Sequence, residues 1–158
     1  MTTDRRKLEY APPGSFPVYE RNSRTHSEAQ IAEVMASMKR WGFTNPLLVD
    51  DKGIIAGHAR DVAAQRLGLK EVPFIRLSGL SDADRKALII ADNKLALNSG
   101  WDVEMLRLEL GDLQAQGFDL GLTGFNSFEI ADIFATRTGL TDPDEAPKLE
   151  EHPVSKLG

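Results

Sequence analysis

The sequence has no cysteine, few aromatic residues and no long hydrophobic run. Its 158 residues include no cysteine, and 7% of them are aromatic. Disulfide bonds and thiol catalysis are therefore excluded. No window approaches the roughly 18 apolar residues of a membrane-spanning helix, and the N-terminus lacks the apolar stretch of a signal peptide. We expect a soluble, cytoplasmic protein with no membrane partner.

Common cofactor and catalytic motifs are missing as well. The chain contains no P-loop, no Gly-x-Gly-x-x-Gly loop and no Gly-x-Ser-x-Gly elbow. Its three histidines (His26, His58 and His152) are scattered, without the Cys/His spacing of a zinc site. We expect no zinc, haem or flavin.

Charge is distributed unevenly along the chain. Residues 1–98 carry 15 Lys and Arg against 12 Asp and Glu, whereas residues 99–158 carry 4 against 12. The acidic total argues against non-specific binding of polyanions, but the mildly basic first part leaves room for a local phosphate site. The acidic C-terminal part is interpreted as a solvated surface.

Apolar spacing and turn residues predict a small α+β domain with about four strands. The strands are expected at residues 16–19, 46–50, 54–56 and 72–77, with the second and third forming a hairpin and the last at a sheet edge because of Pro73. Helices are expected after the N-cap residues Ser27, Ser81, Asp102 and Ser127, and over residues 58–67.

Three segments follow from this pattern. Residues 1–98 are expected to form the α+β core and residues 99–140 a helical extension. Residues 141–158 contain three prolines and charge runs without periodicity, the composition of an acidic linker to a downstream domain.

The strongest candidate site is Gly57-His58-Ala59-Arg60, between a strand and a helix. A helix N-terminus has unpaired N–H groups and a partial positive charge, and glycine lets a ligand approach the backbone closely. Arg60 could clamp phosphate oxygens, and His58 could donate to them or act as a general acid or base. The alternative is a structural turn in which Arg60 pairs with Asp61 or Asp92.

Two further clusters could complete this site. Arg24, in the polar stretch with Asn22, Ser23 and His26, could add positive charge, although an ordinary capping turn is the alternative. Asp92 is a catalytic and metal-ligand candidate, and Asn93 is a candidate ligand for ribose, base or the turn, since it interrupts an apolar stretch. A solvated helix face is the alternative for both.

Five motifs and the helix after Ser27 follow one another between about residues 16 and 98. The motifs are Asn22-Ser23-Arg24, Trp41-Gly42-Phe43-Thr44-Asn45-Pro46-Leu47-Leu48-Val49, Ile55-Ala56-Gly57-His58-Ala59-Arg60, Gly68-Leu69-Lys70-Glu71-Val72-Pro73 and Ala91-Asp92-Asn93-Lys94. In this order they resemble the ParB/sulfiredoxin superfamily, specifically its ParB-like N-terminal domain. The resemblance implies a small mixed sheet flanked by helices. It also implies phosphate or nucleotide binding at Gly57–Arg60, with a nucleoside triphosphate and Mg²⁺ as ligands.

The chain departs from this family at two positions. Sulfiredoxins need a cysteine where His58 stands, so their chemistry is excluded. Partition proteins have a glutamate there and an arginine near Ala96, so their magnesium-dependent CTP hydrolysis does not simply carry over to this chain.

The sequence is most similar to the ParB-like domain found ahead of DNA-modification methyltransferases, with Gly124-Phe125-Asn126-Ser127-Phe128 in the helical segment that follows the core. The resemblance implies an accessory domain that binds nucleotide or DNA, with a methyltransferase domain downstream. Methyltransferase motifs are absent from these residues. A metal-dependent nuclease or nucleotide phosphohydrolase, and an interaction module that could form a homodimer, are the alternatives.

Overall fold

Four strands form one mixed sheet in the computed structural model, which describes residues 6–18 and 26–135. The strands are β1 (Leu8–Ala11), β2 (Leu47–Asp50), β3 (Gly53–Ala56) and β4 (Val72–Arg76), in the order β1-β4-β2-β3. The β2–β3 and β1–β4 pairs are antiparallel, and β2–β4 is parallel. The predicted α+β class, the mixed four-stranded sheet and the β2–β3 hairpin are confirmed.

The first strand lies earlier than predicted. Of the strand predicted at 16–19, Tyr19 lies outside the described residues, and residues 16–18 are not in a strand. The Pro17 carbonyl accepts one hydrogen bond from the Ile54 amide at 3.1 Å, and the Phe16 ring packs edge-on against Phe74. Proline has no N–H with which to continue a ladder. The actual strand, β1, has only four residues and is mostly exposed, so its sequence gives little signal of a buried strand face.

The prediction that Pro73 marks a sheet edge is also wrong. Strand β4 is internal, between β1 and β2. Pairing with β2 begins at Phe74, opposite Leu47, while Pro73 lies opposite Tyr10 of β1. Proline is tolerated because it lies at the start of the strand, before the ladder to β2.

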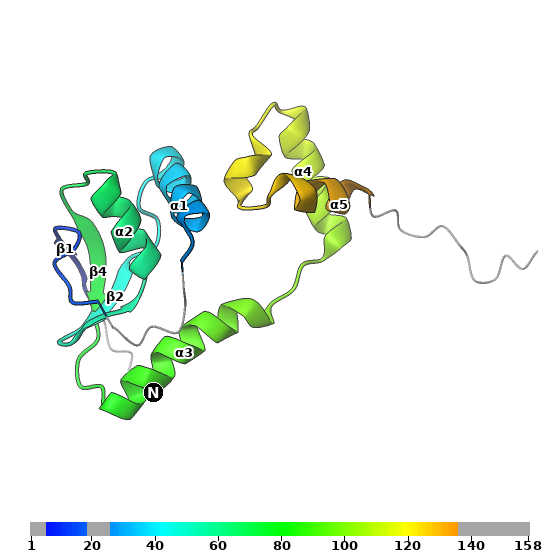
Figure 1. The fold of residues 1–158 in the computed structure, drawn as a ribbon. Coiled ribbons are helices and arrows are strands. Elements are labelled where there is room, and N and C mark those ends of the chain that lie inside the picture. The colour runs from blue at the N-terminus through cyan, green and yellow to red at the C-terminus, as the bar shows by residue number, and fades with distance from the viewer. Residues whose placement is uncertain (1–5, 19–25, 136–158) are drawn as a thin grey trace, which may run out of the picture.

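Helices cover both faces of the sheet (Figure 1). Helices α1 (Glu28–Trp41) and α2 (His58–Arg66) pack together, and α2 covers the face that contains Ile54. Helix α3 (Asp82–Asn98) packs on the other face through Ile89, which contacts Ile55. Because adjacent residues of β3 point to opposite faces, this short strand contacts helices on both sides.

The C-terminal part is helical, as predicted, and lies beyond the long α3 (Figure 1). It contains α4 (Val103–Ala115), a 3₁₀ turn at Leu120–Thr123 and α5 (Ser127–Ala135). The cap of α5 is Asn126 rather than Ser127, because Asn126 Oδ1 accepts from the amides of Phe128 and Glu129, both at 2.9 Å. No helix within the described ranges has the length and apolar character to cross a membrane.

One aromatic contact joins this part to the core. The Trp41 ring, at the end of α1, stacks on Phe118 with centroids 6.4 Å apart, and Arg40 lies over the same Phe118 ring. The second half of α3 and parts of α4 leave large apolar side chains exposed, including Ile90, Leu95, Leu97, Met105 and Leu108.

Candidate functional site

The site is centred on the turn between β3 and α2. Gly57 is the N-cap of α2 and has a left-handed backbone, with φ of 102°. A Cβ at this position would lie 2.6 Å from Leu47 Cδ2 and 2.9 Å from Arg60 Nη2, so the turn has no room for a side chain. Because glycine supplies no side-chain cap, the first amides of α2 are left for another acceptor.

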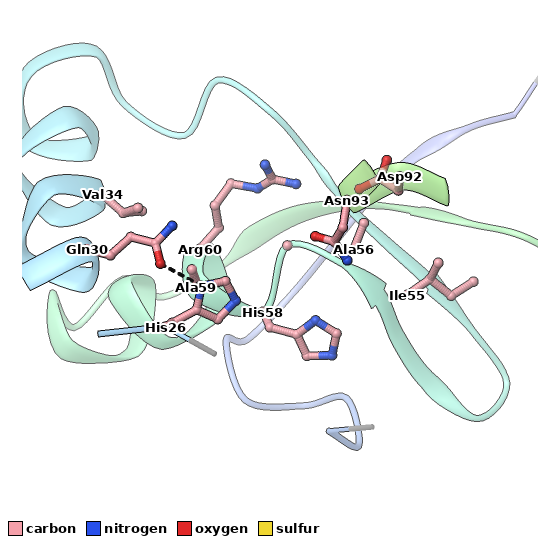
Figure 2. Close-up of a pocket in the computed structure, with 11 residues that line it drawn as sticks. His26, Gln30, Val34, Ile55, Ala56, His58, Ala59, Arg60, Asp92 and Asn93 are labelled. Carbon is pink, nitrogen blue, oxygen red and sulfur yellow. Dashed lines mark hydrogen bonds between the residues drawn. The ribbon is translucent and has the colours of Figure 1, made fainter. Parts of the chain in front are cut away.

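A cavity of about 200 Å³ opens at this turn (Figure 2). It brings together residues from three helices that are far apart in sequence. Five of the six phosphate-binding candidates (Gly57, His58, Ala59, Arg60 and Asn93) line it, as does the metal candidate Asp92. Arg24, the remaining candidate, lies outside the described residues.

Arg60 is partly buried above the turn. One guanidinium nitrogen, Nη2, donates to the Pro46 carbonyl at 3.2 Å. Its buried Nε has no hydrogen-bond partner within the described residues. Burial lowers the pKa of Arg60, while the carboxylate of Asp92 raises it. No ion pair joins Arg60 to Asp61 or Asp92 in the described part of the chain, so the guanidinium retains donor capacity at the cavity.

His58 is the first residue of α2 and is half-buried. Its buried ring atom Nε2 has no hydrogen-bond partner among the residues that the structure describes. Burial lowers the pKa of the imidazole, His26 and Arg85 lower it further, and Asp61 opposes them. At neutral pH the ring is therefore mainly uncharged, and a bound anion would favour its protonation.

Asp92 and Asn93 form the α3 side of the cavity (Figure 2). Asp92 is exposed, and the Asn93 amide donates to the Ile89 carbonyl of its own helix at 2.8 Å. Asn93 thus lies on the helix face that packs against the sheet, which accounts for a polar residue within an apolar stretch.

Asp61 serves the structure rather than the cavity. It is 2% exposed; Oδ1 accepts from the Gly14 amide and Oδ2 from Gln65 Nε2, each at 2.9 Å. Both oxygens are therefore engaged. Across residues 6–18 and 26–135 no three His, Cys, Asp or Glu side chains are grouped as a metal site would require.

Two features of the site were not predicted from the sequence. Gln30 and Val34 of α1 line the cavity, and His26, just before the N-cap Ser27, lies beside them. The spacing of four between Gln30 and Val34 is the signal that could have revealed a shared helix face. The second is a buried ion pair in which Arg85 Nε donates to Asp50 Oδ2 at 2.7 Å. Arg85, Ile89 and Asn93 also recur every four residues, along the packed face of α3.

Two family models and a curated relative match this chain. The model of the ParB N-terminal domain matches residues 17–93, and that of the ParB-methyltransferase HTH domain matches residues 104–157. The ParB-like nuclease domain-containing protein YnaK of Escherichia coli is 45% identical over 85 residues, which are 53% of this chain and 98% of YnaK.

A solved structure supports the fold. The chromosome-partitioning protein ParB of Caulobacter crescentus, in a C-terminally truncated form complexed with CTP-γ-S, superposes with a TM-score of 0.63. The match covers 80% of this chain and 76% of that protein, at 24% identity. On the family models, the YnaK match and this fold, the chain belongs to the ParB-like family, of the type that carries a ParB-methyltransferase HTH domain.

Proposed function

We propose that the chain binds a nucleoside triphosphate at the β3–α2 turn and DNA through its helical C-terminal part. One observation carries the nucleotide proposal: the glycine-capped N-terminus of α2, Arg60 and His58 meet at one cavity. Backbone amides, a guanidinium and an imidazole are the donors that phosphate oxygens accept from.

Each residue has a distinct role in this proposal. The amides of His58 and Ala59 bind a phosphate along the axis of α2, and Arg60 neutralises a second phosphate from above the turn. His58 can donate from a ring N–H, and protonation of the ring adds a positive charge beside the phosphates. Asn93 supplies an amide at the α3 side. Arg24, outside the described residues, stays a predicted phosphate ligand.

The similar proteins support the proposed binding of nucleotide and DNA in two ways. The Caulobacter ParB structure contains CTP-γ-S, a nucleotide analogue, in a protein of the same fold. The model matched at residues 104–157 is an HTH domain, and helix-turn-helix modules place a helix in the DNA major groove. We extend the proposal to the accessory role in a DNA-modification methyltransferase that the sequence resemblance implies. The domain division, with an α+β core at residues 1–98, a helical extension at 99–140 and an acidic linker at 141–158, stays part of this proposal.

Mg²⁺ fits the site only together with a nucleotide. Among residues 6–18 and 26–135, Asp92 is the single carboxylate that lines the cavity, and Mg²⁺ is commonly held by one or two carboxylates plus substrate phosphates and water. In this arrangement Asp92 would hold the ion beside the phosphates. The charge of the ion would offset the repulsion between the Asp92 carboxylate and the phosphates. Mg²⁺ should therefore strengthen triphosphate binding through Asp92.

A thermal-shift panel tests the nucleotide proposal. Wild type is heated with each of the four nucleoside triphosphates or inorganic tripolyphosphate, with and without Mg²⁺. A ligand at one hundred times its Kd stabilises by about 2.7 kcal/mol, which gives a shift of several degrees. Arg60→Ala should abolish the shift. Arg66→Ala is the matched control, since Arg66 is in the same helix but exposed and paired with Glu28. No shift with any ligand would refute the proposal.

The nuclease or phosphohydrolase alternative is favoured by the name of the similar YnaK protein and by Asp92 at the cavity edge. Its metal would have to be held without Asp61, which is engaged elsewhere. His58 is then the candidate general base or acid. Phosphate release or plasmid nicking that disappears in Asp92→Asn would support this activity, and turnover unchanged by that substitution would refute it.

The interaction-module alternative is favoured by the exposed apolar side chains of α3 and α4. These side chains would be covered in a homodimer. Light scattering after size exclusion, with and without nucleotide, distinguishes a monomer from a dimer. A monomer under all conditions would refute the homodimer.

A further inference from the structure

We propose that Gln30 is the residue that reads the nucleobase, and that His26 positions it for this role. The inference rests on the proposed nucleotide function and adds a specificity determinant on α1. It starts from the wall of the cavity that neither the phosphate-binding turn nor α3 provides. His26, Gln30 and Val34 form this wall.

The three walls of the cavity differ in charge. The β3–α2 turn supplies helix amides and Arg60, which suit phosphate, and the α3 wall carries the carboxylate of Asp92. The α1 wall offers an amide, an imidazole and an isopropyl group. Figure 2 shows Gln30 and Val34 on the opposite side of Arg60 from Asp92 and Asn93. A neutral, partly apolar ring fits the α1 wall better than it fits the other two.

A hydrogen bond fixes the direction in which the Gln30 amide points. The two side chains meet with His26 Nδ1 and Gln30 Oε1 3.0 Å apart. Because the oxygen can only accept, His26 Nδ1 carries the proton and donates. The Oε1 end of the amide is then occupied, and the two N–H groups of Nε2 are directed away from His26 (Figure 2).

This orientation makes the α1 wall a hydrogen-bond donor with an apolar neighbour. A free glutamine can rotate its amide and offer either a donor or an acceptor, so it discriminates poorly. Once His26 holds the oxygen, Gln30 presents only donors, which match a ring nitrogen or carbonyl oxygen at the edge of a base. Val34 supplies apolar contact one helical turn further along α1. All four bases carry acceptors, so the donors discriminate by position. They favour a base that places a ring nitrogen or carbonyl oxygen opposite Gln30 Nε2 and penalise one that places an N–H or amino group there.

The experiment separates base reading from phosphate binding. Affinities are measured by calorimetry for the four nucleoside triphosphates and for inorganic tripolyphosphate, which has no base. The variants are Gln30→Met, which keeps length and charge, His26→Ala and His26→Asn. Glu33→Gln, on an exposed position of α1 that does not line the cavity, is the control.

Wild type is expected to bind one nucleotide at least tenfold more tightly than the least favoured one. In Gln30→Met this range should shrink to within threefold, while tripolyphosphate affinity changes by less than twofold. His26→Ala should reduce discrimination, and His26→Asn should restore most of it because its amide can replace the Nδ1 donor. Glu33→Gln should behave as wild type.

Two results would overturn the inference. One is wild-type affinity that does not differ among the four nucleotides, and the other is discrimination that survives Gln30→Met unchanged. Either can occur while tripolyphosphate still binds and still requires Arg60, which leaves the proposed phosphate site intact. If tripolyphosphate and all four nucleotides fail to bind wild type, the proposed function itself fails.

Discussion

Asp50 at the end of β2 and Arg85 in the first half of α3 form a buried ion pair, with Arg85 Nε 2.7 Å from Asp50 Oδ2. Arg85 also donates from Nη2 to the Ile54 carbonyl at 3.3 Å, and Asp50 Oδ1 accepts from the Lys52 amide. The pair thus fixes α3 against the β2–β3 hairpin. Since α3 carries Asp92 and Asn93, this contact also positions one wall of the cavity.

Arg85→Met should strongly destabilise the fold. It leaves the Asp50 carboxylate buried without its cation, and breaking a buried pair costs about 3–5 kcal/mol. Urea denaturation measures the free energy of unfolding. Asp50→Asn combined with Arg85→Met should cost less than the two single changes added, because the residues are coupled.

The matched control for this prediction is Lys52→Ala. Lys52 pairs with Asp82 at the surface, and both side chains are well exposed. Exposed pairs contribute about 0–1 kcal/mol. If Arg85→Met lost no more stability than Lys52→Ala, the structural role assigned to the buried pair would be wrong.

Gly57→Ala should both destabilise the protein and weaken anion binding. Its φ of 102° is unfavourable for a side chain, at a cost of about 1–3 kcal/mol, and the added Cβ would push against Leu47 and Arg60. Gly68→Ala is the control, since Gly68 has φ of 67° and open space around it. Both variants should have a lower free energy of unfolding in denaturation, but the affinity for tripolyphosphate should fall only in Gly57→Ala. Equal tripolyphosphate affinity in both variants would contradict the proposal that the Gly57 turn binds phosphate.

Stability should fall in acid partly because of His58. Its folded-state pKa is lowered from the usual value, chiefly by burial. The unfolded chain therefore binds more protons near pH 6, so the contribution of His58 is present above about pH 6.5 and is lost as the pH falls toward the folded pKa. Unfolding free energies from pH 8 to pH 5 should decline more steeply in wild type than in His58→Gln. Parallel curves would refute the assignment.

Substitution of Asp61 should lower stability, whereas substitution of Asp92 should affect ligand binding. Asp61→Ala leaves the Gly14 amide and the Gln65 side chain without their acceptor and should cost about 1–3 kcal/mol in urea unfolding. Asp92→Ala, at an exposed position, should cost less than about 0.5 kcal/mol but remove the Mg²⁺ dependence of triphosphate binding. The reverse pattern would show that the metal is held by Asp61.

Local chemistry in the sequence determined much of the fold and the centre of the candidate site. Ser27, Ser81 and Asp102 cap their helices as predicted, because capping depends on a side chain and the amides two or three residues later. The Gly57 turn could be predicted for the same reason: strand, glycine and helix are adjacent in the chain. Family resemblance then pointed to the other segments.

The tertiary structure alone decided how strands other than the β2–β3 hairpin pair and which distant side chains meet. The predictions for residues 16–18 and for an edge position of Pro73 were wrong because strand order depends on contacts between segments more than 60 residues apart, as between β1 and β4. The α1 wall and the Asp50–Arg85 pair arise in the same way. A sequence pattern reports the period and the turns of its own segment, whereas packing brings Gln30, Arg60 and Asp92 to one cavity.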